Sequence, residues 1–66
     1  MFRFKRELIL PYFLGLKIDI GTLARTARVA SKTVKKAVNG EPVAASVVGK
    51  ICDALKINAL DYLDES

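Results

Sequence analysis

The chain has 66 residues, of which 52% are hydrophobic, and its formal net charge is +4. This length predicts a single small domain over residues 1–66. The single cysteine excludes an intrachain disulfide, and the lack of histidine argues against a zinc site.

The first sixteen residues are the hardest to interpret, because Pro11 lies in an apolar run. A proline inside a helix removes the hydrogen bond to Glu7 and clashes with the preceding turn. Two arrangements are open: a kinked helix from about Phe4 to Leu14, or an extended arm over Phe2–Phe4 followed by a helix that begins near Pro11. We favour the kinked helix. The run Leu8–Leu16 is too short to span a bilayer and lacks a signal-peptide cleavage pattern, so we expect a cytoplasmic protein.

Two short helices joined by a tight turn are predicted over residues 20–39. Asp19 is a suitable N-cap for the first helix, Ile20–Ala27, and Gly40 ends the second, Ser31–Asn39. At about 100° per residue, the apolar side chains of the second helix lie opposite an arc of polar ones. The polar arc holds Lys32, Lys35, Lys36 and Asn39, and the apolar side holds Val34, Ala37 and Val38.

Two further helices are predicted at Ala44–Leu55 and Ala59–Leu63, the second capped by Asn58. Cys52 lies on the apolar face of the first and is interpreted as a small buried hydrophobe. Residues 1–3 and 64–66 are expected to fray. The predicted core holds Leu23, Ala27, Val29, Val34, Val38, Ile51 and Leu55, with Tyr12 and Phe13 added from the N-terminal segment.

Positive charge is concentrated in one part of the chain. Residues 20–40 hold five basic residues and no acidic one, whereas the rest holds six basic against seven acidic residues. A helix with one buried face and one face of lysine and asparagine suits a nucleic acid, because lysines neutralise phosphates and asparagine binds polar edges. The alternative is a solvated basic face, which is the default for an arbitrary amphipathic helix.

A pattern of fixed spacing runs through this basic segment and beyond it. It consists of Leu23-Ala24, Val29, Thr33-Val34 and Asn39-Gly40, followed by Pro42 and by residues 51–57 and 58–63. Over about residues 18–63 the pattern resembles the lambda-repressor-like family, which includes Cro-like and XRE-type helix-turn-helix regulators. The resemblance implies an all-α fold, a compact bundle of about five short helices with a central helix-turn-helix at about 20–39. The chain departs from the pattern at two positions. Arg28 stands where the family has glycine, and Ala30 stands where the family has a serine or threonine that caps the helix. Ser31, one residue later, would then serve as the cap.

The resemblance also implies roles for particular residues. The helix over 31–39 would enter the major groove, with its leading residues at base edges and the later ones near the backbone. The implied base-reading residues are Ser31, Lys32 and Lys35. The implied phosphate contacts are Thr22, Arg25, Arg28, Thr33, Lys36 and Asn39. The implied homodimer interface is Leu60, Tyr62 and Leu63.

The function implied is sequence-specific binding of double-stranded DNA by a Cro-like transcriptional regulator of a phage or mobile element. We expect a repressor that acts by operator occupancy, associated with the nucleoid. The alternative is a protein-interaction module, an antirepressor or modulator that binds a partner repressor. No enzyme is expected, because the chain has no histidine, no glycine-rich phosphate loop and no clustered carboxylates. No cofactor, metal, membrane or small-molecule ligand is expected either.

Overall fold

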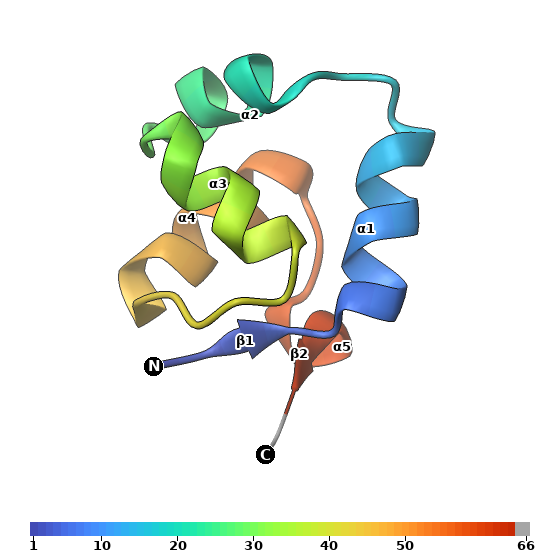
Figure 1. Ribbon diagram of the computed structural model, residues 1–66, viewed down its shortest axis with the longest axis vertical. Coiled ribbons are helices and arrows are strands. Elements are labelled where there is room, and N and C mark those ends of the chain that lie inside the picture. The colour runs from blue at the N-terminus through green and yellow to red at the C-terminus, as the bar shows by residue number, and fades with distance from the viewer. Residues whose placement is uncertain (65–66) are drawn as a thin grey trace.

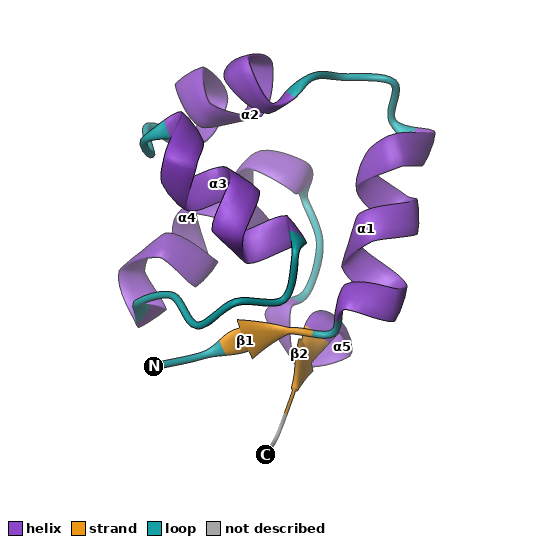
Figure 2. Cartoon of the chain, viewed as in Figure 1, coloured by secondary structure: helices purple, strands orange, loops and turns teal. Residues whose placement is uncertain are grey.

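Five helices and two very short strands form residues 1–64, the part of the chain that the computed structural model describes. The helices are α1 (Arg6–Gly15), α2 (Ile20–Ala27), α3 (Ser31–Val38), α4 (Ala45–Leu55) and α5 (Ala59–Tyr62), and the strands are β1 (Arg3–Phe4) and β2 (Leu63–Asp64). Figures 1 and 2 show α2, α3 and α4 on one side, α1 on the other, and the strands with α5 along one end. The mostly helical globule, 29 × 22 × 18 Å, confirms the predicted helical class.

Helices α2 to α5 lie within one residue of their predicted bounds. The side chain of Asp19 accepts a hydrogen bond from the Thr22 N–H at 2.7 Å, and that of Asn58 accepts one from the Leu60 N–H at 3.0 Å, so both predicted caps are confirmed. Helix α3 ends one residue early, because the backbone of Asn39 leaves helical geometry as the C-cap. Helix α5 ends before Leu63, because that residue is extended and pairs in β2.

The N-terminal arm is held between two distant parts of the chain. Phe2 and Val43 exchange two backbone hydrogen bonds of 2.8 Å, and β1 pairs antiparallel with β2, with Arg3 opposite Asp64 and Phe4 opposite Leu63. The arm therefore bridges the loop after α3 and the C-terminal segment. This differs from the expectation that residues 1–3 and 64–66 fray, since Arg3 and Asp64 are in strands; residues 65 and 66 lie outside the described part.

Helix α1 contains Pro11 in its interior, so neither predicted arrangement of the N-terminus is correct as a whole. The extended arm exists, but the helix begins at Arg6 instead of Phe4 or Pro11. The carbonyl of Glu7, which loses its helical donor, is on an exposed residue and can be hydrated. On the opposite face Ile9 and Phe13 are buried, and their packing offsets the lost hydrogen bond.

None of the helices within residues 1–64 is long and apolar enough to cross a membrane.

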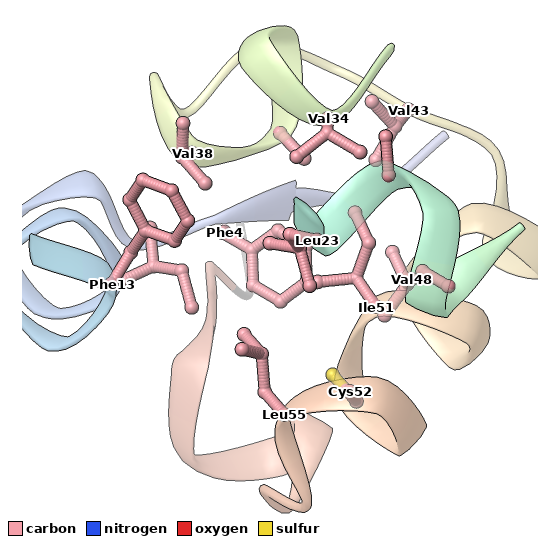
Figure 3. Close-up of a cluster of buried hydrophobic side chains, with 14 residues drawn as sticks. Phe4, Phe13, Leu23, Val34, Val38, Val43, Val48, Ile51, Cys52 and Leu55 are labelled. Carbon is pink, nitrogen blue, oxygen red and sulfur yellow. The ribbon is translucent and has the colours of Figure 1, made fainter. Parts of the chain in front are cut away.

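One hydrophobic cluster joins the arm, the helices and the loop after α3 (Figure 3). Of the predicted core, six members are buried and Val29 is only partly buried. Phe13 is buried as expected, whereas Tyr12 is half-buried, with its hydroxyl 3.4 Å from the Leu55 carbonyl. Cys52 is buried, and burial raises the pKa of its thiol. The buried residues that the sequence analysis did not place in the core are Phe4, Ile9 and Val43.

Gly40 is the point where the end of α3 meets the start of α1. Its φ is +80°, and a Cβ placed there would lie 3.1 Å from the Cβ of Arg6 and 3.4 Å from the carbonyl oxygen of Phe4. Both the left-handed backbone and the close approach therefore favour glycine.

We expect Gly40→Ala to lower the free energy of unfolding by about 1–2 kcal/mol, because a side chain is strained in this backbone conformation and crowds α1. The matched control is Gly49→Ala in the interior of α4, where a Cβ meets nothing within 4 Å. That variant should gain about 0.5–1 kcal/mol from helix propensity. Chemical denaturation of both variants measures the change in the free energy of unfolding, which should be negative for Gly40→Ala and positive for Gly49→Ala. Equal stabilities would contradict the packing at Gly40.

Candidate nucleic-acid interface

The N-terminus of α2 is already occupied by a carboxylate. Hydrogen bonds from the Thr22 side chain, and then from its backbone N–H, hold the pKa of Asp19 below its ordinary value, with Arg25 contributing a smaller electrostatic effect. Asp19 is therefore anionic at neutral pH and lies at the helix end that would otherwise attract a phosphate. Thr22 is exposed, but this carboxylate makes it the weakest of the predicted phosphate contacts.

The turn between α2 and α3 has a left-handed residue at Arg28, the position where the family pattern has glycine. Arg28, at the C-cap of α2, has φ 58° and ψ 46°, which is the left-handed region. A non-glycine residue in this conformation costs on the order of 1 kcal/mol. The following N–H, of Val29, donates to the Ala24 carbonyl at 3.0 Å, and the half-buried Val29 side chain packs against the core. The guanidinium of Arg28 is thereby presented on an exposed residue beside the start of α3.

Helix α3 begins without a side-chain cap. Ala30 is the N-cap, and Ser31 is the first helical residue, so the prediction that Ser31 serves as the cap is wrong. The N–H groups of Thr33 and Val34 donate to the Ala30 carbonyl, whereas those of Ser31 and Lys32 make no backbone hydrogen bond within residues 1–64. The leading end of α3 thus offers two exposed donors to an acceptor outside the protein.

The predicted division of α3 into two faces is confirmed. Its inner face packs into the core, with Val34 and Ala37 fully buried and Val38 only 3% exposed. Thr33, at the boundary, is half-buried. The remaining predicted site residues of this helix and its C-cap are all exposed, namely Ser31, Lys32, Lys35, Lys36 and Asn39. Figure 3 shows Val34 and Val38 of α3 among the side chains of the core. Because this inner face is closely packed, the lysines of the outer face are attached to a rigid helix.

The five cations of the α2–α3 segment are available to an external anion. Arg25, Arg28, Lys32, Lys35 and Lys36 are all exposed, and within residues 1–64 none of them forms an ion pair. For Arg28 and the three lysines no internal pairing therefore has to be reversed before they contact phosphate, whereas Arg25 also interacts electrostatically with Asp19. Their charge is also not offset by an acidic residue of the same segment.

A sixth basic residue, Arg6, lies close to the C-terminal end of α3 and was not among the predicted site residues. It is exposed at the start of α1, and its Cβ lies close to Gly40 at the end of α3. In the sequence it is separated from Gly40 by the rest of α1 and by the whole of α2 and α3. No local pattern identifies it, because only the approach of α1 to Gly40 brings it there.

The three predicted dimer residues do not form one exposed patch. Leu60 is 81% exposed. Tyr62 is half-buried in an edge-to-face contact with Tyr12, with ring centroids 5.6 Å apart, and Leu63 is half-buried in β2. Of the three, only Leu60 is presented to solvent in full, so the homodimer interface stays a prediction.

The fold and the site together define a small, mostly helical domain with one rigid, basic and exposed helix face. No family model, curated protein or solved structure was found to match the chain.

Proposed function

We propose that this protein binds double-stranded DNA through α3 and regulates transcription, with α2 and α3 acting as a helix-turn-helix. The observation that carries the proposal is the outer face of α3, where three lysines without ion pairs project from a helix whose other face is buried. With its side chains an α-helix is about 10–12 Å in diameter, which suits a major groove about 12 Å wide. Unpaired lysines on a rigid helix are well suited to phosphates and to guanine acceptors.

Within this proposal the exposed residues divide by their position along α3. Ser31, Lys32 and Lys35 contact base edges, the first two also offering free backbone N–H groups at the leading end of the helix. Lys36 and Asn39, nearer the other end, contact the backbone. Arg25 and Arg28 add phosphate contacts. Thr22 contributes less because the Asp19 carboxylate lies beside it, and Thr33 contributes less because it is half-buried.

Binding to an operator would be enough for this protein to regulate transcription. A domain that covers an operator excludes polymerase or a competing repressor without needing a second activity, so we propose a repressor. A homodimer would read two half-sites about one helical turn, ~34 Å, apart.

The second candidate function is a protein-interaction module. Exposed apolar side chains favour it, with Leu14 64% and Leu60 81% exposed, because a partner protein could cover them. The concentration of unpaired cations on α3 favours DNA instead, because a protein partner would have to supply matching acidic groups.

Binding to random duplex DNA at several salt concentrations tests the proposal. Three or more phosphate contacts predict that log K falls with log salt with a slope of about −2.7 or steeper. The matched control is Lys50→Ala, which removes an exposed lysine from the outer side of α4 and should leave the slope unchanged. Absence of binding, or affinity that does not depend on salt, would contradict DNA binding and favour the interaction module.

A further inference from the structure

The start of α1 and the end of α3 approach each other closely (Figure 1). A Cβ added to Gly40, the residue after the C-cap of α3, would lie 3.1 Å from the Cβ of Arg6, the first residue of α1. The N–H of Glu41 donates to the Lys36 carbonyl at 3.0 Å, so the chain after Gly40 turns back over the last turn of α3. The side chain of Arg6 therefore begins close to the end of α3 that carries Lys36 and Asn39.

The backbone that carries Arg6 is held in place on both sides. Phe4, two residues earlier, is 2% exposed and pairs across the β1–β2 sheet. The Lys5 N–H donates to the Tyr62 carbonyl at 2.6 Å, and Ile9, in the first turn of α1, is fully buried. Packing thus fixes the position of Arg6 relative to α3, as it fixes the position of the α3 lysines.

The side chain of Arg6 is available to an external anion. It is exposed, and within residues 1–64 it forms no hydrogen bond or ion pair. It also lines an open hollow, which leaves the guanidinium room to move. Two exposed acids lie nearby in the sequence, Glu7 beside Arg6 and Glu41 beside Gly40, and they weaken the diffuse positive field at this end of α3. Arg6 would therefore act by direct contact, for which the planar fork of N–H donors on a guanidinium suits phosphate oxygens.

We propose that Arg6 binds a phosphate of the DNA backbone beyond the end of α3, next to the phosphates that Lys36 and Asn39 contact. The proposal rests on the proposed binding of DNA through α3, and it adds a contact from α1. Arg28 lies beside the start of α3 and Arg6 close to its end, so an arginine holds the backbone near each end of the helix. A phosphate contact carries no sequence information, but it fixes the position and orientation of α3 in the groove.

Titration of the full chain against a selected site and scrambled duplex DNA, at several salt concentrations, tests the contact. Arg6→Ala should lower the affinity for both DNAs about two- to fivefold at low salt. The dependence of log K on log salt should become shallower by about 0.9. Arg6→Lys keeps the charge and should keep the slope of the unmodified chain.

The matched control is Lys50→Ala, which removes one exposed charge from the outer side of α4 and should change neither the affinity nor the slope. Arg6→Ala retains the Cβ that lies close to Gly40, and alanine favours the helix, so the fold should be retained. Thermal melts of each variant check this.

A scan of the DNA backbone identifies the contact directly. Each phosphate of the selected site is replaced in turn by an uncharged methylphosphonate, and the affinity of the unmodified chain is compared with that of Arg6→Ala. At the phosphate that Arg6 binds, the neutral group should weaken the unmodified chain about two- to fivefold and leave Arg6→Ala almost unchanged. At the phosphate that Lys36 binds, both proteins should lose affinity.

Two results would overturn the proposal in distinguishable ways. If the unmodified chain binds DNA with a steep salt dependence but Arg6→Ala has the same affinity and slope, or loses as much as the unmodified chain at every methylphosphonate, then Arg6 binds no phosphate and only this contact falls. If the unmodified chain does not bind DNA, the proposed function falls and the contact falls with it.

Discussion

Replacement of Val38 by aspartate is expected to unfold the domain. Val38 lies on the inner face of α3 and is 3% exposed, and the buried residues within 1–64 include no charged one that could pair with a carboxylate. A carboxylate buried there without a partner costs several kcal/mol. A chain of this size has a total stability of only about 3–10 kcal/mol, so one such substitution removes most of it. Far-ultraviolet circular dichroism during thermal and chemical denaturation measures the loss.

The control is Lys50→Asp, which introduces the same side chain on the outer side of α4. Lys50 is exposed, and the new carboxylate stays hydrated, so the free energy of unfolding should change by no more than about 0.5 kcal/mol. The two variants should therefore differ sharply in melting temperature. If they melted together, α3 would not be packed as the structure has it.

Removal of the leading lysines of α3 is expected to weaken binding to a selected DNA site. Lys32→Ala and Lys35→Ala should each cost about 1–3 kcal/mol on that site, because each removes a contact to base acceptors. Discrimination between the selected site and scrambled DNA should fall at the same time. Lysine prefers guanine acceptors, so we expect guanines near the centre of each half-site.

Lys36→Ala should behave differently, since it removes a phosphate contact. Affinity should fall alike on the selected site and on scrambled DNA, and the salt slope should become shallower by about one unit. All three lysines are exposed and unpaired, so none of these substitutions should alter the fold. Titration of each variant against both DNAs at several salt concentrations separates the two roles. Unchanged affinities in all three variants would show that α3 does not bind DNA.

Local sequence was sufficient to locate α2 to α5 and the buried face of α3. Asp19 and Asn58 cap their helices through hydrogen bonds that span three residues or fewer. The capping residue therefore lies next to the helix that it predicts. The burial of Val34 and the exposure of Lys32 and Lys35 both follow from helical periodicity alone.

The N-terminal segment could not be predicted in this way. Phe4 is buried because β1 pairs with β2 at the other end of the chain, and Phe2 bonds to Val43. Such pairing has no local pattern when the strands are two residues long. Pro11 is tolerated inside α1 because the inner face of that helix is packed, a tertiary effect that outweighs its low helix propensity.

The sequence by itself determined the amphipathic form of α3 and the concentration of cations around it, because both depend on spacing and residue type over a short segment. Only the tertiary structure decided which distant residues lie together. It placed Arg6 beside Gly40 and buried part of Tyr62 against Tyr12. Both contacts join residues far apart in the chain, and contacts of that kind are fixed by the packing of whole helices.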